Sequence, residues 1–290
     1  MVGHDRIGAR RRRSLHVHEP LAGTMDLHAQ RLNGLMPGGR GVWVPIDHGA
    51  SDWPVAGLEH PLELVRLLRD GGADAIVAQK GLISHVLHHD PQIGVGLVAH
   101  LSVSTRHGGP DAGEKVSVGD VAEAIARGAT GVSAQVNIGT PGEGRMIERL
   151  GAVTRDAFTN DVPTLGMVYA RGEHLNVMDG DASGGQAHGV RLAFELGCAV
   201  AKAAWTGDEA SFRTVVDAAP IPVLVAGGPR TDDDEALLSM VHRAMRCGAS
   251  GVCMGRQIFA HPHPDRIVRA IASIVHHEAD VVDAMKHLEG

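Results

Sequence analysis

The sequence predicts an α/β fold, a single (β/α)8 TIM barrel. From residue 41 onward, short apolar runs alternate with segments whose apolar residues recur at helical spacing. The runs are apolar throughout, as parallel strands are when helices cover both faces of the sheet. Eight such runs within about 250 residues match the size of this barrel. A doubly wound open sheet is the alternative, but no GxGxxG motif follows the first run.

The first forty residues precede this pattern and carry the basic run Arg10–Arg13. We expect residues 1–40 to form a short disordered leader and residues 41–290 to form the barrel domain. The leader has no apolar segment of the kind found in secretory signals. No run in the chain approaches the roughly 20 apolar residues that cross a membrane, so no membrane association is expected.

Each expected strand is an apolar run that ends in polar or glycine residues. The strands are expected at 41–47, 74–81, 94–102, 131–139, 162–172, 199–207, 221–229 and 250–259. The helices between them are expected at 61–73, 117–129, 142–158, 183–198, 208–219, 232–249 and 264–279. Ser117 is a candidate cap for the helix at 117–129, and Gly128 is a candidate terminator.

Composition narrows the class of protein. The net charge of −7 gives no reason to expect a nucleic-acid partner, and 43% hydrophobic residues allow a large core. The three cysteines form no metal-spaced pair, which suits reduced thiols in a cytoplasm. The 19 histidines show no convincing metal cluster, so no metal site is expected.

Lys202 is the main catalytic candidate because it lies in the apolar run AVAKAAWTG, at an expected strand end. Desolvation lowers the pKa of a lysine, and a partly neutral amine can form a Schiff base with a ketone. The alternative is a lysine that points outward and extends its ammonium into water. Lys80, at the end of the second run, is its only rival.

Two further strand ends carry groups that could move protons. Tyr169 is the only tyrosine in the chain, and its hydroxyl could donate a proton. Asp47 could serve as a general acid and base that faces Lys202. The alternatives are a buried structural tyrosine and an aspartate that fixes a loop or caps a helix.

Glycine-rich turns follow the last two expected strands, where TIM barrels bind phosphate through backbone N–H groups and a helix N-terminus. The candidate phosphate contacts are Gly227, Gly228, Gly255 and Arg256. We expect glycine there because a Cβ would block the approach of the phosphate. A phosphate-binding site, an amine nucleophile and two groups that can transfer protons together indicate class I aldolase chemistry. The iminium is the electron sink in such a reaction, so no cofactor is expected.

The motifs VPIDHGAS, GADAIVAQKG, LVAHLSVST, LGMVYARG, ELGCAVAKAAWTG, VLVAGGP and GVCMGRQIF resemble those of the archaeal-type class I aldolases. The resemblance extends over residues 40–285. It implies a carbon–carbon lyase (aldehyde-lyase) or a related transaldolase-type synthase, with Lys202 as the Schiff-base lysine, Asp47 as acid and base, and Tyr169 as proton donor. It also implies that substrate contacts come from His48, Gly49, Ser51, Arg171, Gly227, Gly228, Gly255 and Arg256.

Within this family the sequence is most similar to the amino-heptulosonate synthases and the actinobacterial amino-oxo-heptanoate phosphate synthases. Met167 stands where the fructose-bisphosphate aldolases tend to have tryptophan. The resemblance implies a phosphorylated ketone such as dihydroxyacetone phosphate and, as its aldehyde partner, L-aspartate 4-semialdehyde. The departures Gln135, Ala170 and Trp205 bear on the second substrate. Class I fructose-1,6-bisphosphate aldolase, a phosphorylated-dione thiolase and a non-catalytic binding barrel remain as alternatives.

Members of this family form rings of barrels, so the resemblance implies a homo-oligomer. The segment 280–290 has an apolar face at Val281, Met285 and Leu288 that could contribute to an interface. The alternative is that this face packs against its own barrel.

Overall fold

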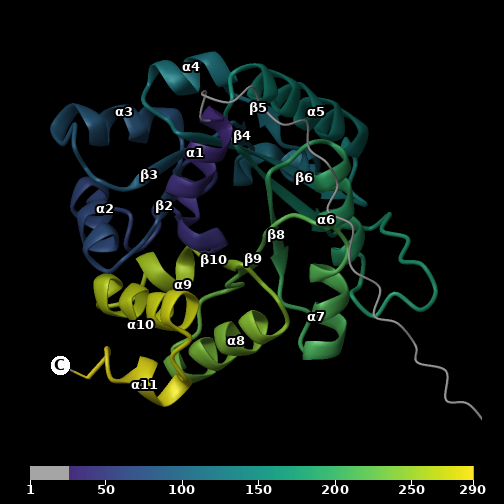
Figure 1. Cartoon of the computed structure of the whole chain (residues 1–290). Coiled ribbons are helices and arrows are strands. Elements are labelled where there is room, and N and C mark those ends of the chain that lie inside the picture. Colours follow the sequence, from purple (N-terminus) through teal and green to yellow (C-terminus); the bar gives the residue numbers. More distant parts are fainter. Residues whose placement is uncertain (1–25, 290) are drawn as a thin grey trace, which may run out of the picture.

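The computed structural model describes residues 26–289 and confirms the TIM barrel (Figure 1). Eight parallel strands close in the order β1-β10-β9-β8-β7-β6-β3-β2, with helices packed outside them. These strands are β1 (Gly41–Pro45), β2 (Ala75–Ala78), β3 (Gly96–His100), β6 (Gly131–Ile138), β7 (Thr164–Ala170), β8 (Val200–Ala204), β9 (Val223–Ala226) and β10 (Gly251–Cys253). Closure of the sheet excludes the open doubly wound alternative.

Helices connect the strands, and a small hairpin interrupts one connection. The helices are α1 (Leu27–Leu35), α2 (Pro61–Asp70), α3 (Lys80–His89), α4 (Val121–Ala126), α5 (Glu143–Thr159), α6 (Gln186–Glu195), α7 (Glu209–Val216), α8 (Asp234–Arg246), α9 (Arg256–Phe259), α10 (Pro264–His277) and α11 (Val281–Met285). The antiparallel hairpin pairs β4 (Ser102–Val103) with β5 (Val116–Ser117), and the short 3-10 segments are η1 (Pro37–Gly39), η2 (Asp47–Ala50) and η3 (Arg106–Gly113).

Side chains alternate between the inside of the barrel and the layer beneath the helices. On β8, Val200 belongs to the interior cluster, whereas Ala201 and Ala203 belong to the cluster between sheet and helices. Both environments are apolar, which explains why the strands read as continuous apolar runs. Lys202 shares the inward face with Val200, since residues two apart along a strand point the same way.

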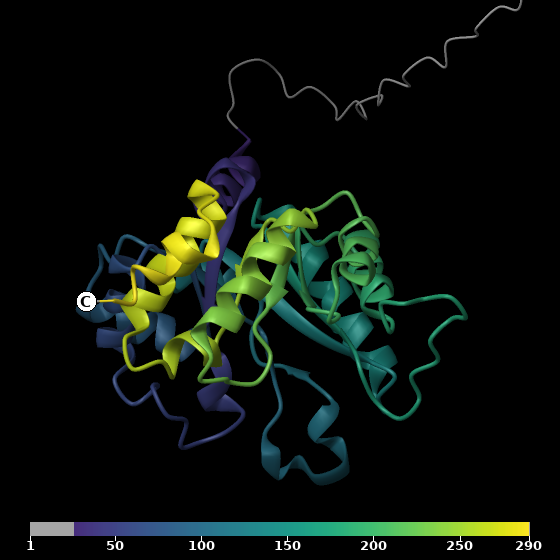
Figure 2. The same ribbon diagram turned by 90° about the horizontal axis from the view of Figure 1, so that it is seen from below.

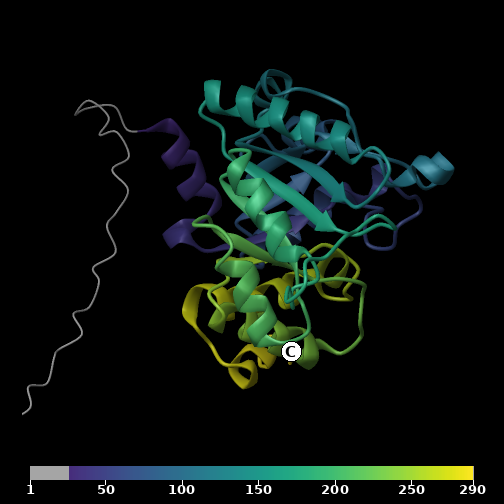
Figure 3. The ribbon, with the colours of Figure 1, turned by 90° about the vertical axis from the view of Figure 1, so that its right-hand side faces the viewer.

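The prediction of a disordered leader is wrong for residues 27–39, which fold as α1 and η1. Leu35 and Met36 are 1% and 2% exposed and close the amino end of the barrel. The Trp43 indole nitrogen donates a hydrogen bond to the Leu35 carbonyl at 2.8 Å. Figures 2 and 3 show α1, in purple, at the end opposite to the β4–β5 hairpin. Residues 1–25 of the expected leader lie outside the described residues.

Glycines of two strands make room for this plug. A Cβ on Gly96 would lie 2.4 Å from Leu35 Cδ2, and a Cβ on Gly131 would lie 2.9 Å from Leu35 Cδ1. Both distances are too short for carbon atoms that are not bonded, so the plug requires glycine at both strand starts.

Three local expectations need correction. The strand expected at 74–81 ends at Ala78, and residues 80–89, of which 82–89 were given no element, form α3, which buries Ile83 and Val86 against the core. The strand expected at 250–259 ends at Cys253, and residues 256–259 turn into the short helix α9. Ser117 pairs with Ser102 in the hairpin, and Asp120 caps α4 instead, accepting from the Glu123 N–H at 2.7 Å. Gly128 does follow α4 in a left-handed conformation, as expected.

The apolar face at the end of the chain packs against its own barrel. Val281, Met285 and Leu288 all contact the main core, and α11 packs on α8 and α10. This arrangement matches the alternative interpretation, so these side chains give no support to an oligomer. Among residues 26–289, no helix is both long and apolar enough to cross a membrane.

The plug predicts a large effect on stability. We expect Leu35→Ala to lower the free energy of unfolding by about 2–5 kcal/mol, because it removes a buried side chain and leaves a cavity. Chemical denaturation followed by tryptophan fluorescence measures the change. Leu27→Ala is the matched control, since Leu27 lies on the same helix and is 43% exposed. Equal stability of the two variants would mean that α1 is dispensable to the barrel.

Candidate active site

A cavity of about 600 Å³ opens at the carboxyl ends of the strands. Ten of the predicted site residues line it: Asp47, His48, Ser51, Tyr169, Arg171, Lys202, Gly227, Gly228, Gly255 and Arg256. The structure describes all of the predicted site residues, and among them Gly49 does not line the cavity. It lies in η2, against the Trp53 ring. The rival Lys80 starts α3 and is paired with Glu123 at 2.8 Å, so it is not part of the lining.

Lys202 lies in the middle of β8 and is 8% exposed. Its backbone is in register with Met167 on β7 and Leu224 on β9, and the side chain projects into the cavity. The outward-pointing alternative is therefore wrong. The parallel strand dictates this placement, because Val200 below it faces the apolar interior and Ala204 above it faces the mouth.

Burial is the effect that the sequence analysis expects to hold Lys202 partly neutral, and three neighbouring groups oppose its effect on the pKa. Burial lowers the pKa of the ammonium, but the Cys253 thiol, the Tyr169 hydroxyl and the Asp47 carboxylate outweigh burial, and the pKa is raised. Burial also raises the pKa of both Cys253 and Tyr169, so both groups are uncharged near neutral pH. Asp47 is then the anion that compensates the ammonium.

Asp47 follows β1 and sits between two histidines. Its Oδ1 lies 3.5 Å from His48 Nδ1, and its Oδ2 lies 3.7 Å from His100 Nε2. Burial raises the pKa of Asp47, but His100, His48 and Lys202 together lower that pKa by more than burial raises it, so the carboxylate stays ionised. The other ring nitrogen of His100 is 2.8 Å from Ser133 Oγ on the neighbouring β6, which fixes the ring against the strand.

Both histidines are themselves uncharged. Burial lowers the pKa of His48 and of His100, and Asp47 offsets this only in part. The Nδ1 atom of His48 is buried and has no hydrogen-bond partner among residues 26–289. The Asp47–Lys202 pair is therefore the site's principal pair of opposite charges, and the imidazoles act as polar neighbours.

Tyr169 stands near the end of β7 beside Lys202. Its ring is covered by the Arg171 guanidinium, whose central carbon lies 4.4 Å from the ring centre. A cation over an aromatic face is attracted by the ring and keeps it oriented. Because burial raises the pKa of Tyr169, the phenol keeps its proton and can serve as a donor.

The glycines of the two turns are required by packing of the protein on itself. A Cβ on Gly255 would lie 2.7 Å from both the His48 ring and the Pro45 carbonyl oxygen. A Cβ on Gly227 would lie 2.9 Å from Gln257 Cγ, while Gly228 adopts a left-handed φ of 67°. The contacts of Gly227 and Gly255 require glycine there in addition to the expected room for a phosphate, which stays a prediction.

Gln257 joins the two turns. Its amide nitrogen donates to the carbonyls of Gly227 and Pro229 at 3.1 and 2.5 Å, and its amide oxygen accepts from the Thr231 N–H at 3.2 Å. The side chain is 4% exposed and comes from α9, directly after Arg256. One buried amide thus fixes the turn after β9 to the turn after β10.

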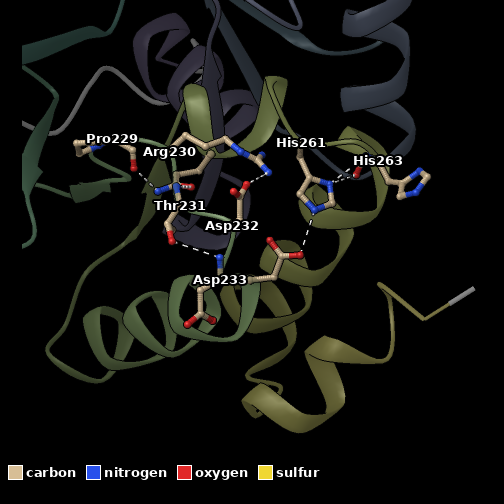
Figure 4. A network of polar contacts seen from close by, with 9 residues as sticks. Pro229, Arg230, Thr231, Asp232, Asp233, His261 and His263 are labelled. Atoms are coloured by element: carbon tan, nitrogen blue, oxygen red, sulfur yellow. Dashed lines mark hydrogen bonds and ion pairs between the residues drawn. The ribbon is translucent and has the colours of Figure 1, made fainter.

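A second set of contacts fixes the start of α8 below this turn (Figure 4). Asp233 caps the helix by accepting from the Ala236 N–H at 2.8 Å, and its own N–H donates to Thr231 Oγ1 at 3.2 Å. His261 Nδ1 accepts from the His263 N–H, which leaves Nε2 to donate to Asp234 Oδ2 at 3.1 Å. The amino end of α8 is therefore served by its own carboxylates rather than free to hold a phosphate.

Sequence reasoning missed several lining residues. Lys115 enters the cavity from the β4–β5 hairpin, and Gln186 enters from the start of α6. His100 and Cys253 end barrel strands. His100 could have been found by its place at a strand end, but nothing in the pattern around Lys115 signals its role. Within residues 26–289, no group of three or more His, Cys, Asp or Glu side chains is arranged to hold a metal ion.

The match to known proteins decides the family. Residues 42–261 match the family described as DeoC/LacD family aldolase. The chain belongs to the DeoC/LacD aldolase family. Its fold is the TIM barrel and its activity is of the aldehyde-lyase type.

Two named relatives and one solved structure are similar to this aldolase. The 2-amino-3,7-dideoxy-D-threo-hept-6-ulosonate synthase of Halobacterium salinarum is 38% identical, over 86% of this chain and 92% of the relative. The 2-amino-4,5-dihydroxy-6-oxo-7-(phosphonooxy)heptanoate synthase of Streptomyces griseus is 36% identical, over 80% and 84%. An archaeal fructose-1,6-bisphosphate aldolase, solved with its catalytic lysine covalently bound to the carbinolamine intermediate, has a TM-score of 0.75 and 29% identity, covering 86% of this chain and 99% of that chain.

The charge pair predicts how the aldolase responds to loss of Asp47. We expect Asp47→Asn to lower the pKa of Lys202, because the variant loses a carboxylate that raises it while burial remains. Borohydride trapping of a small ketone, measured against pH, follows the amine. The midpoint of trapping should move to lower pH, even though turnover falls. Asp52→Asn removes a cavity carboxylate already paired with Arg106 and serves as control. An unchanged midpoint in Asp47→Asn would show that other groups set the charge of Lys202.

Proposed function

We propose that this aldolase joins dihydroxyacetone phosphate to L-aspartate 4-semialdehyde through a Schiff base on Lys202. The observation that carries the proposal is a buried lysine that faces an ionised Asp47 and a protonated Tyr169 at one mouth of the barrel. The glycine turns and Arg256 at the same mouth offer backbone N–H groups and a guanidinium to a phosphate.

The printed name of the Streptomyces griseus relative supports this choice of substrates. Its product carries a ketone at carbon 6 and hydroxyls at carbons 4 and 5. Aldol cleavage between carbons 4 and 5 gives a phosphorylated three-carbon ketone and a four-carbon amino aldehyde. These two fragments are dihydroxyacetone phosphate and aspartate 4-semialdehyde.

The first step requires a neutral amine, and the ion pair can supply one internally. A ketone that fills the cavity displaces water and strengthens desolvation around both charges. Desolvation lowers the pKa of Lys202 and raises that of Asp47, so it favours transfer of the proton from the ammonium to the carboxylate. The amine then attacks the ketone carbon, and the carbonyl oxygen takes a proton from the acid.

The remaining steps pass protons between the same groups. Loss of water from the carbinolamine leaves an iminium on Lys202, and removal of a proton from the adjacent carbon gives an enamine. The enamine carbon attacks the aldehyde carbon, and the aldehyde oxygen receives a proton from the Tyr169 hydroxyl. Water then hydrolyses the new iminium and restores the amine. Asp47 and Tyr169 are close enough to Lys202 to set its pKa, which suits them to these transfers.

Fructose-1,6-bisphosphate aldolase is the second candidate. It uses the same donor ketone with glyceraldehyde 3-phosphate, and relatives of that name are 29–30% identical to this chain. Met167 favours the first candidate, because it lines the cavity at the position where the resemblance places tryptophan in that group.

Trapping and mapping test the chemistry. We expect borohydride with dihydroxyacetone phosphate to fix a covalent adduct on the peptide that contains Lys202, identified by mass spectrometry. Lys202→Met should abolish both adduct and turnover, whereas Lys80→Met should keep both, since Lys80 is paired outside the cavity. An adduct on another lysine would overturn the mechanism. A coupled assay with each aldehyde then distinguishes the two candidate reactions.

The phosphate end of the cavity gives a separate prediction. Charge-assisted hydrogen bonds contribute roughly 1.5–3 kcal/mol each, so Arg256→Ala should raise KM for dihydroxyacetone phosphate by about ten- to a hundredfold. KM for unphosphorylated dihydroxyacetone should change far less. The two ketones and two enzymes form a double-mutant cycle. Equal losses for both ketones would place the phosphate away from Arg256.

A further inference from the structure

The cavity is more cationic than the proposed donor requires. Four cationic side chains line it, namely Lys115, Arg171, Lys202 and Arg256, although the whole chain has a net charge of −7. Of the two lining carboxylates, Asp47 faces Lys202, and Asp52 is paired with Arg106 at 2.9 Å. A phosphate bound at Arg256 therefore leaves Lys115 and Arg171 without a carboxylate of their own in the cavity lining.

Lys115 and Arg171 line the same cavity. Arg171 lowers the pKa of Lys115 by charge repulsion, in addition to the effect of burial. Among the described side chains of residues 26–289, which do not include that of Asp111, neither Lys115 nor Arg171 has a carboxylate within ion-pair distance. Two like charges kept together without a counter-ion are costly, and a bound anion would remove that cost.

Hydrogen bonds fix the backbone of Lys115, although its side chain pairs with no carboxylate among the described side chains. Its N–H donates to Met146 Sδ at 3.3 Å, and its carbonyl accepts from Arg149 at 2.5 Å. The preceding Glu114 turns to α5, where Arg145 and Arg149 hold its carboxylate. These partners all come from α5, so the loop is held against a long helix.

The barrel interior fixes the same loop from the other side. Asn137, near the end of β6, donates to the Gly113 carbonyl at 2.6 Å, and Gln135 donates to Asn137 Oδ1 at 2.8 Å. The hairpin register Ser102↔Ser117 and Val103↔Val116 completes the support. A loop tied at this many points presents the Lys115 ammonium with little ordering cost, as a binding site requires.

The position of Lys115 separates it from the phosphate turns. It follows β3 through the hairpin, and β3 lies opposite β9 in the closed strand order. Gly227 and Gly228 follow β9, and Lys202 on β8 lies between the two sides. A donor with its phosphate at the β9 and β10 turns would therefore direct its reacting carbon toward Arg171 and Lys115.

We propose that Lys115 and Arg171 form the subsite for an anionic group on the acceptor aldehyde. This inference rests on the proposed function and adds the residues that select its second substrate. The anion is a carboxylate in an amino-acid semialdehyde and a phosphate in a triose phosphate. The subsite would hold either group by charge, and the support of the loop sets how far it lies from Lys202.

Steady-state kinetics with three acceptors test the subsite. Dihydroxyacetone phosphate is the donor, and the acceptors are L-aspartate 4-semialdehyde, D-glyceraldehyde 3-phosphate and uncharged propanal. We expect Lys115→Met to raise KM for the preferred anionic acceptor by about ten- to a hundredfold. KM for propanal and for the donor should stay within about twofold. Lys115→Arg should recover most of the loss, and Lys286→Met, on α11 and paired with Asp283, is the charge-matched control.

The outcomes separate this inference from the function on which it rests. The proposed subsite is wrong if Lys115→Met raises KM for propanal as much as KM for the anionic acceptor, or if it raises neither KM. The acceptor that responds tells whether the anion is a carboxylate or a phosphate. Failure of dihydroxyacetone phosphate to form an adduct overturns the proposed donor. Calorimetric titration with the two anionic aldehydes then still tests the subsite. Equal affinities of wild type and Lys115→Met for both aldehydes would overturn the subsite.

Discussion

A charged ammonium inside an apolar barrel is the constraint to which the site responds. Lys202 is almost fully buried among strands that supply mostly carbon, so its charge needs an anion near it. Asp47 supplies that anion from across the mouth, and the Lys202 ammonium in turn lowers the pKa of Asp47. Removing either partner would leave a charge without compensation, which is why the pair, rather than either residue alone, defines the site.

The same pair reconciles a raised pKa with nucleophilic chemistry. In the proposed mechanism, the free enzyme keeps the Lys202 amine as an ammonium, which does not react with stray carbonyl compounds. A substrate that excludes water shifts both members of the pair toward their neutral forms. Reactivity is then coupled to occupancy of the cavity, and the fold provides this coupling by placing opposite charges on β8 and after β1.

The sequence was sufficient for the barrel and placed ten of the eleven predicted site residues in the cavity. Parallel strands with apolar residues on both faces read as continuous runs, and their polar ends meet at one mouth, so Lys202, Asp47 and Tyr169 could be brought together before any coordinates. Lys115 could not, because its loop has no periodicity and its place depends on contacts with α5. Gln257 was assigned to a strand, since the change from β10 to α9 occurs within a few residues. The charge of Lys202 depends on distances to groups from other strands, which the sequence pattern does not give.

The α1 plug has a consequence for the order of events. Leu35, Met36 and Trp43 fill the amino end of the barrel, which leaves the mouth with Lys202 as the side where the cavity opens. In the proposed reaction, two molecules share a cavity that opens at this mouth, and we expect the molecule that reaches Lys202 to enter before the one that sits nearer the hairpin. The joined product must then leave through the same opening before another donor can enter. A helix at the far end of the barrel, in contact with neither substrate, would in this way impose a compulsory-order kinetic scheme.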